Sequence, residues 1–186
     1  MKVTNLFNKK KRNTPAHNLP FLQELVDITK NGFVDKAIQL LVTKGTSNNS
    51  VSIPYTQEAV RTDFQAVRQC MVSENLADNE LAALLVVTMM KKHPKNISQL
   101  LSDNGYSLPS LERIMYLSTY ITTLTSLAEF VSIGVKKYKI SSCGDTKVCK
   151  ECTKHSGKKH FVDKAVIGKT APPFCEKCRC VIIAEF

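Results

Sequence analysis

The sequence predicts a mainly α protein: a multi-helix bundle followed by a small β-hairpin module that is stapled by a metal ion. Three observations support this fold class. Apolar residues recur at helical spacing over most of residues 20–137. Short β-leaning stretches follow this segment. Two Cys-x-x-Cys pairs, Cys149 with Cys152 and Cys175 with Cys178, lie in the last forty residues, and such paired knuckles are typical of metal sites.

The first two predicted helices are short and are followed by a loop. Residues 21–31 carry apolar side chains at three- to four-residue spacing, and Gly32 is placed to end this helix as a C-terminal cap. Residues 33–42 repeat the same pattern, and the second helix is expected to stop before Gly45. Residues 45–54 form the longest polar break of the chain, so a loop is expected there.

Four further segments complete the predicted bundle. Thr56 is expected to cap a third helix, and Asp78 a fourth helix that is apolar nearly all round and therefore central. A short turn at residues 97–101 follows. Ser110 is then expected to open the longest helix, over residues 111–137, which leads directly into the metal module.

The composition divides the chain into three predicted parts. We expect a disordered basic tail over residues 1–17, a helical bundle over residues 18–137 and a zinc-binding module over residues 138–186. The net charge of +10 is concentrated at the two ends, around a body that is slightly acidic. Basic ends favour phosphate-rich partners, so we expect weak, non-specific nucleic-acid contact. The candidate residues for this contact are Lys9, Lys10, Lys11, Arg12, Lys158 and Lys159.

The cysteine count and the hydropathy pattern bear on the compartment. Seven cysteines are an odd number, which argues against a complete disulfide framework. The chain starts with a charged, polar segment that does not have the apolar run of a secretory signal. The longest apolar runs are too short or too interrupted for a membrane span. We therefore expect no membrane contact and a reducing, cytoplasmic location in the host cell.

The two knuckles predict one Zn²⁺ site with Cys149, Cys152, Cys175 and Cys178 as ligands. A tetrahedron of four thiolates suits this cation, and each Cys-x-x-Cys turn supplies two ligands from one short piece of backbone. The loop between the knuckles has 22 residues, slightly longer than usual but easily closed by a hairpin at Gly157-Lys158. The alternative interpretation is a set of free or disulfide-bonded cysteines.

The remaining chemistry-bearing residues receive simpler interpretations. His155 and His160 are expected not to be ligands, because four cysteines already complete the tetrahedron. Cys143 and Cys180 are expected to be spare thiols, although Cys180 could compete with Cys178. Cys70 lies on an apolar helical face and is expected in the core.

The end of the chain resembles a known family. Pro172-Pro173 precede the second knuckle, and Cys178-Arg179-Cys180 close it. Over residues 138–183 this pattern resembles the C-terminal region of the phage Mu F-type head morphogenesis (minor head protein) family, which typically ends in Pro-Pro-x-His-x-x-Cys-Arg-Cys. Cys175 stands where that family usually has His, and both residue types are common zinc ligands. The resemblance implies a zinc-stapled end that works in capsid or portal assembly.

Three functions follow as hypotheses. The first is a non-enzymatic phage or prophage assembly protein, virion-associated or cytoplasmic, whose partners are capsid or portal proteins. The second is a zinc-knuckle nuclease or toxin-type effector, with His155 or His160 as its base. The third is a zinc-ribbon regulator that binds nucleic acid. Four thiolates leave no open coordination position, and the segment after Arg179 is predicted as a strand and not as the helix of treble-clef nucleases. Both points favour the non-enzymatic hypothesis.

Overall fold

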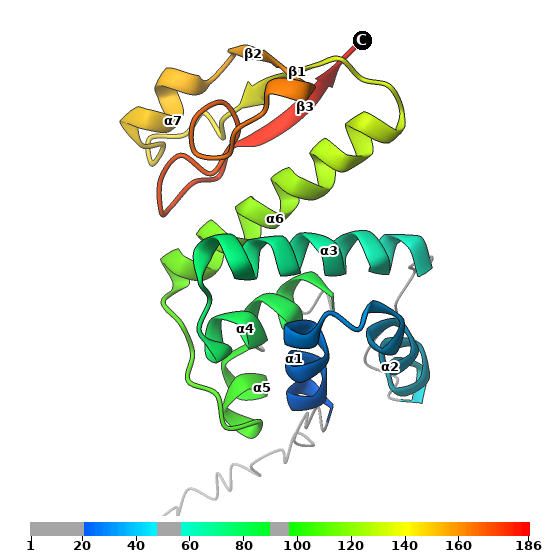
Figure 1. Ribbon diagram of the computed structural model, residues 1–186. Helices are drawn as coiled ribbons and strands as arrows, with labels where there is room; N and C mark the ends of the chain where they lie inside the picture. The colour runs from blue at the N-terminus through cyan, green and yellow to red at the C-terminus, as the bar shows by residue number, and fades with distance from the viewer. Residues whose placement is uncertain (1–20, 48–56, 90–96) are drawn as a thin grey trace, which may run out of the picture.

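The computed structural model describes residues 21–47, 57–89 and 97–186. It confirms the predicted fold class, with seven α-helices in the described part of the chain and a three-stranded antiparallel sheet at the C-terminal end (Figure 1). The expected basic tail, with Lys9 to Arg12, lies outside the described residues, as does the predicted cap Thr56. Among the described helices, none is long and apolar enough to cross a membrane.

Helix α1 (Leu22–Asn31) ends at Gly32 as predicted. Gly32 has a φ of 78°, in the left-handed region that favours glycine, and its N–H group bonds the carbonyl of Thr29. A Cβ atom at Gly32 would lie 2.1 Å from the guanidinium of Arg68, which donates to the same Thr29 carbonyl at 3.0 Å. Gly32 therefore serves both the turn and the close approach of Arg68 from the third helix.

Helix α2 (Val34–Ser47) is longer than predicted. The expectation that it stops before Gly45 is wrong, because the helix passes through Gly45 and ends at Ser47. A glycine inside a helix costs only about 1 kcal/mol relative to alanine, so neighbouring turns can override it. The expected loop over residues 45–54 is thus wrong at its start, and the rest of it falls outside the described residues.

The next three helices are α3 (Gln57–Glu74), α4 (Asp78–Thr88) and α5 (Ile97–Asp103). Asp78 was predicted as the cap of α4 but is its first helical residue; the cap is Ala77. Ala77 has no polar side chain, and its backbone N–H donates instead to the carboxylate of Glu80 at 3.1 Å. The short turn expected at residues 97–101 is a two-turn helix, α5.

Helix α6 (Leu111–Ser132) starts as predicted and ends earlier. The hydroxyl of Ser110 accepts from the backbone N–H of Arg113 at 3.1 Å, as an N-cap does. The helix stops at Ser132 and not near residue 137, because Gly134 takes a left-handed conformation with a φ of 78°. Lys137 then belongs to the first strand.

The helical body buries one core, with α4 at its centre as predicted. Six consecutive residues of α4, from Leu81 to Val86, are buried, which agrees with its apolar sequence on all sides. Helices α1, α3, α5 and α6 all contact α4. The largest fully buried side chains of this core are Phe21, Phe64, Leu22, Leu25, Leu41, Leu81, Leu84, Leu85, Ile97, Leu101 and Leu117.

The C-terminal part is a sheet in the order β2–β1–β3, with β1 (Lys137–Ser141) in the centre. Strands β2 (Lys159–Phe161) and β3 (Val181–Glu185) both pair with β1 in antiparallel register. The predicted hairpin required Gly157 to turn between two strands, and this expectation is wrong. Gly157 follows helix α7 (Lys150–His155) and donates its N–H to the carbonyl of Ile140 at 2.8 Å, which brings the chain back to the sheet.

Helix α6 joins the two parts. Its first half packs in the body, where Ile114, Leu117 and Ile121 are buried. Near its end, Phe130 belongs to a second core with Tyr138 and other residues of the sheet and knuckles. In Figure 1 α6 runs diagonally from the body to the underside of the sheet. The module therefore rests on a helix that also belongs to the bundle.

Candidate metal centre

The first knuckle is formed at the start of α7. Cys149 is the N-cap of this helix, and its sulfur accepts the backbone N–H of Cys152 at 3.3 Å. A cysteine in this position has its sulfur directed to unpaired N–H groups, which favour the thiolate form. Cys152 lies on the inner side of the same turn and is only 3% exposed.

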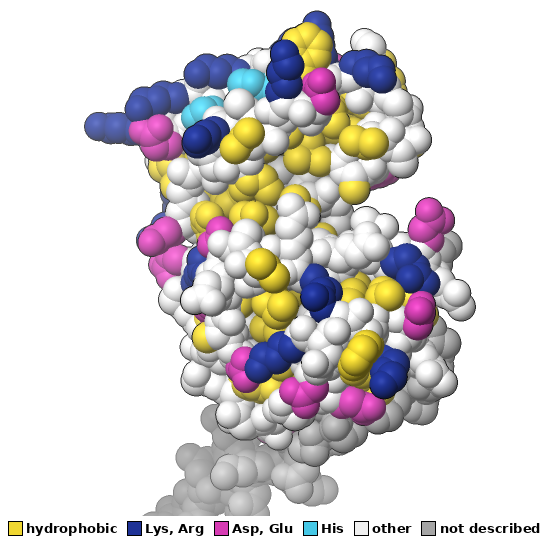
Figure 2. All heavy atoms as spheres, viewed as in Figure 1, with side chains coloured by type: hydrophobic (Ala, Val, Ile, Leu, Met, Phe, Trp, Pro, Cys, Tyr) yellow, Lys and Arg dark blue, Asp and Glu magenta, His cyan; other side chains and the backbone are white. Residues whose placement is uncertain are grey.

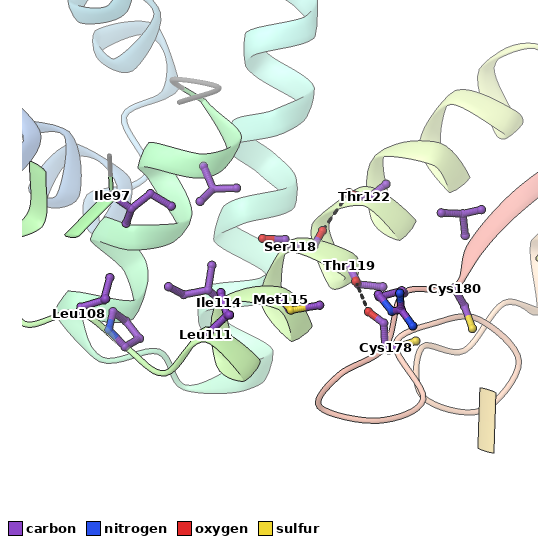
Figure 3. Close-up of a pocket in the computed structure, with 14 residues that line it drawn as sticks. Ile97, Leu108, Leu111, Ile114, Met115, Ser118, Thr119, Thr122, Cys178 and Cys180 are labelled. Carbon is purple, nitrogen blue, oxygen red and sulfur yellow. Dashed lines mark hydrogen bonds between the residues drawn. The ribbon is translucent and has the colours of Figure 1, made fainter. Parts of the chain in front are cut away.

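The second knuckle is a tight turn that contacts α6. The N–H of Cys178 donates to the carbonyl of Cys175 at 3.0 Å, which closes the turn. The hydroxyl of Thr119, in the middle of α6, donates to the carbonyl of Cys178 at 2.9 Å (Figure 3). The bundle thus holds the second knuckle in place by a direct hydrogen bond.

The fold brings three of the four predicted ligands, Cys149, Cys152 and Cys175, into one group, and it places the fourth, Cys178, in a second group that shares Cys152. Cys152 lies between the others, with its sulfur 3.6 Å from the sulfur of Cys175 and 3.6 Å from that of Cys178. The sulfurs of Cys149 and Cys175 are 3.0 Å apart, far beyond the length of a disulfide bond. All seven cysteines, including these four, are free thiols. The cluster can hold a metal ion.

One further cysteine belongs to the same cluster. Cys180 is 2% exposed, and its sulfur lies within 4.8 Å of the sulfurs of Cys152 and Cys178. The sulfurs form two overlapping groups that share Cys152: one with Cys149 and Cys175, the other with Cys178 and Cys180. The spacing of Cys178 and Cys180 already suggested competition between them, but only the turn before β3 shows that both sulfurs face Cys152.

A bidentate ion pair between Arg179 and Asp145 lies on the outer side of the cluster. The guanidinium of Arg179 donates to both carboxylate oxygens of Asp145, at 2.8 and 2.7 Å. Asp145 also accepts the backbone N–H of Lys147 at 3.0 Å, and the thiol of Cys143 donates to the carbonyl of Arg179 at 3.4 Å. The segment before the first knuckle is thereby joined to the middle of the Cys178-Arg179-Cys180 sequence. Arginine suits this task because its planar fork matches a carboxylate.

The surroundings shift the pKa values of the thiols in opposite directions. The hydrogen bond between Cys149 and Cys175 and the one from the N–H of Cys152 lower the pKa of Cys149. Burial raises the pKa of Cys175 to about 11 and that of Cys180 to about 12, and it also raises the pKa of Cys152. In the absence of metal the buried thiols thus keep their protons, which a bound cation must displace.

Neither histidine lies among the cysteine groups that can hold a metal. The ring of His155 stacks on Phe174 with centroids 3.9 Å apart, and burial lowers the pKa of His155. His160 faces Tyr138, with ring centroids 5.9 Å apart. Within the described residues, Nδ1 of His155 and Nε2 of His160 have no hydrogen-bond partner. These two nitrogens are therefore not oriented by a carboxylate, as that of a catalytic base would be.

The other candidate residues lie apart from the cluster. Cys70 is fully buried in the core of the body, as predicted. Lys158 and Lys159 follow α7 and are exposed, and Lys159 pairs with Glu185. The predicted contact residues Lys9 to Arg12 fall outside the described part of the chain.

A mostly apolar groove separates the module from the body next to the second knuckle. Its volume is about 440 Å³, and it passes between the first half of α6 and the turn at Cys178 to Val181 (Figure 3). Leu108 and Leu111 at its mouth are 51% and 62% exposed.

Comparisons with family models, curated proteins and solved structures found no match for this chain.

Proposed function

We propose that the protein is a non-enzymatic assembly or interaction component whose C-terminal module is held by one structural Zn²⁺. The observation that carries this proposal is the cluster of five cysteine sulfurs, of which Cys152, Cys178 and Cys180 are buried. In a tetrahedral site with zinc–sulfur bonds of about 2.3 Å, neighbouring sulfurs are about 3.8 Å apart. The two separations of 3.6 Å around Cys152 are close to this value. The sulfurs of Cys149 and Cys175 are closer, at 3.0 Å, and Cys178 groups with Cys152 and Cys180, so the four sulfurs would have to rearrange around Cys152 to form one tetrahedron.

A structural role for zinc follows from the type and burial of the ligands. Cys149, Cys152, Cys175 and Cys178 would complete a tetrahedron and leave no position for a water molecule. Cys152 and Cys178 are at most 3% exposed, so a substrate would not reach the ion from that side. In this site zinc would hold the two knuckles together, and the ligating thiolates would carry no reaction.

The assembly role draws on the resemblance to the phage Mu F-type head morphogenesis family. One residue of the pattern shared with that family links the two knuckles: Arg179, at the centre of Cys178-Arg179-Cys180, is hydrogen-bonded to Asp145 ahead of the first knuckle. The exposed leucines beside the groove add an apolar surface of the kind that protein partners cover. Capsid or portal proteins are the partners that this resemblance favours.

Two measurements test the proposal. Protein purified without chelator should contain about one zinc per chain. The full-length protein should also co-purify with the portal or capsid protein of its own genome, and Leu111→Asp should weaken this association more than Val72→Asp, a matched change at a 72% exposed site on α3. Absence of metal from fully folded protein would refute the zinc site, and equal effects of the two substitutions would refute the groove as the docking surface.

A nuclease assay separates this proposal from its enzymatic alternative. Plasmid DNA and RNA are incubated with the protein and Mg²⁺ or Zn²⁺, and the same assay is run with His155→Ala and His160→Ala. We expect no cleavage, because within the described residues Nδ1 of His155 and Nε2 of His160 have no hydrogen-bond partner to orient the rings as bases. Cleavage that disappears with either substitution would replace the assembly role by a nuclease.

A further inference from the structure

The outer face of the sheet combines lysines with an exposed aromatic ring. Partner residues in an antiparallel sheet point to the same side. The register places Lys137 between Phe161 of β2 and Glu185 of β3, and Lys139 between Lys159 and Ile183. The alternate residues Tyr138, Ile140 and Ile182 are buried against the second core. The outer face is therefore not needed for packing.

Phe161 is the aromatic centre of this face. Its side chain is 46% exposed although it belongs to a strand. The ammonium groups of Lys137 and Lys164 lie 4.8 and 5.6 Å from the centre of its ring, one from the central strand and one from the short helix after β2. Two cations thus lie near a ring that is nearly half exposed to solvent.

The charge of this face is positive. Four lysines lie around Phe161, and two acidic residues, Glu185 and Asp163, offset part of their charge. The lysines are Lys137, Lys139, Lys159 and Lys164. Glu185 pairs with Lys159, and Asp163 is exposed next to Lys164. A hollow of about 490 Å³ adjoins the face and is lined in part by Lys136, Lys137 and Lys159. Figure 2 shows dark-blue lysine and arginine side chains gathered over the upper part of the molecule, which is the C-terminal module.

We infer that the outer face of the β2–β1–β3 sheet binds single-stranded nucleic acid, with a base stacked on Phe161 and phosphates held by Lys137, Lys139 and Lys164. Aromatic rings on an open sheet bind unpaired bases, whereas the bases of a duplex are already stacked on one another. Lysine–phosphate contacts and stacking do not use the 2′-hydroxyl group, so DNA and RNA strands should bind alike. This inference rests on the nucleic-acid contact included in the proposed function and gives it a location.

The test measures binding of the full-length zinc-loaded protein to a fluorescent oligothymidylate by anisotropy. Phe161→Ala should weaken binding roughly tenfold, since one stacked base is lost. Phe33→Ala is a matched control, because Phe33 is 50% exposed and has Lys36 at 4.6 Å from its ring, but it lies on the helical body. We expect this control to bind as the parent protein does. Background binding by the basic residues 9–12 is common to all variants.

The salt dependence gives a second readout. For single strands, each phosphate contact contributes about 0.7 to the slope of log K against log salt. Lys139→Ala should therefore reduce the slope by about that amount, whereas Lys36→Ala should leave it unchanged. An oligouridylate should bind as well as the oligothymidylate, and a DNA duplex should bind more weakly and lose little affinity with Phe161→Ala.

Several results would overturn the inference. These are unchanged binding by Phe161→Ala, an equal loss with Phe33→Ala, or a duplex that binds as tightly as the single strand and depends equally on Phe161. Displacement of the oligonucleotide by polyglutamate at equal charge concentration would show that the face binds acidic polymers in general. Zinc content and near-ultraviolet circular dichroism are measured on every variant. A variant that loses binding but keeps its zinc content and its circular dichroism spectrum tests the sheet face alone. A variant that loses zinc tests the zinc site of the proposed function instead.

Discussion

Replacement of Cys152 by serine should remove the metal and unfold the C-terminal module while most of the bundle stays helical. Cys152 is the sulfur shared by both cysteine groups, and its two neighbours lie at 3.6 Å. Structural zinc sites contribute on the order of 10 kcal/mol to folding, far more than the small second core can supply alone. The zinc content of Cys152→Ser should therefore fall from about one per chain to near zero.

The structure sets the size of the expected helix loss. Helix α7 has 6 residues, and the last 6 of the 22 residues in α6, Leu127 to Ser132, include the part that packs in the second core. If only these segments unfold, about one in seven of the described helical residues is lost. The far-ultraviolet signal should thus decrease by roughly 15%, because helices α1 to α5 have their own core.

Tyr138 reports on the module separately. Its side chain is fully buried beneath the sheet, and its hydroxyl donates to the carbonyl of Thr170 at 3.0 Å. The chain has no tryptophan, so tyrosines dominate the near-ultraviolet signal. Tyr138 is the one of five tyrosines that lies in the module, so the variant should lose its share of this signal and keep that of Tyr116 and Tyr120 in the bundle. The parent protein treated with a strong chelator should show the same change.

Cys143→Ser is the matched control. Cys143 is exposed and lies outside both cysteine groups, so this variant should keep its zinc and its spectra. A folded, metal-free Cys152→Ser protein with a normal tyrosine signal would refute a structural metal. Loss of most of the helical signal would show instead that the bundle and the module unfold as one unit.

Three further predictions concern the bundle and its contact with the module. Thr119→Val removes the hydrogen bond to the carbonyl of Cys178 and should lower the unfolding free energy by about 1 kcal/mol. The hydroxyl of Thr122 bonds the carbonyl of Ser118 in the same helix, so Thr122→Val should lower the unfolding free energy less. Denaturant titration compares the two variants. Ser110→Ala should lower the unfolding free energy by about 1 kcal/mol through loss of the α6 cap, and an unchanged denaturation midpoint would contradict this cap. Burial raises the pKa of Asp63 to about 6, so the folded protein keeps this proton between about pH 4 and 6 and loses stability as the pH rises through that range. Asp63→Asn should stabilise the protein by about 1 kcal/mol at pH 7, after allowance for the half-exposed side chain, and by nothing near pH 4; thermal unfolding at both pH values tests this.

Local patterns along the chain were enough to predict most of the helices and the two turns that carry the cysteine pairs. Gly32 and Ser110 mark helix ends because their effect depends on backbone geometry and short-range hydrogen bonds, which neighbouring residues define. The four knuckle cysteines were predictable for the same reason, since a Cys-x-x-Cys turn directs two sulfurs to one point. The prediction that the helix stops before Gly45 is wrong because the weak tendency of glycine to end helices yielded to the rest of helix α2.

The sequence by itself determined the fold class and the pairs of cysteines, whereas the tertiary structure decided which distant groups meet. Cys180 faces Cys152, and Arg179 binds Asp145, only because β3 pairs with β1 and returns the second knuckle to the first. The outer face with Phe161 likewise depends on the register of two strands that are separated from each other by helix α7. Local patterns fix backbone conformation over one or two turns, but contacts between segments far apart in sequence depend on how all the apolar faces pack at once.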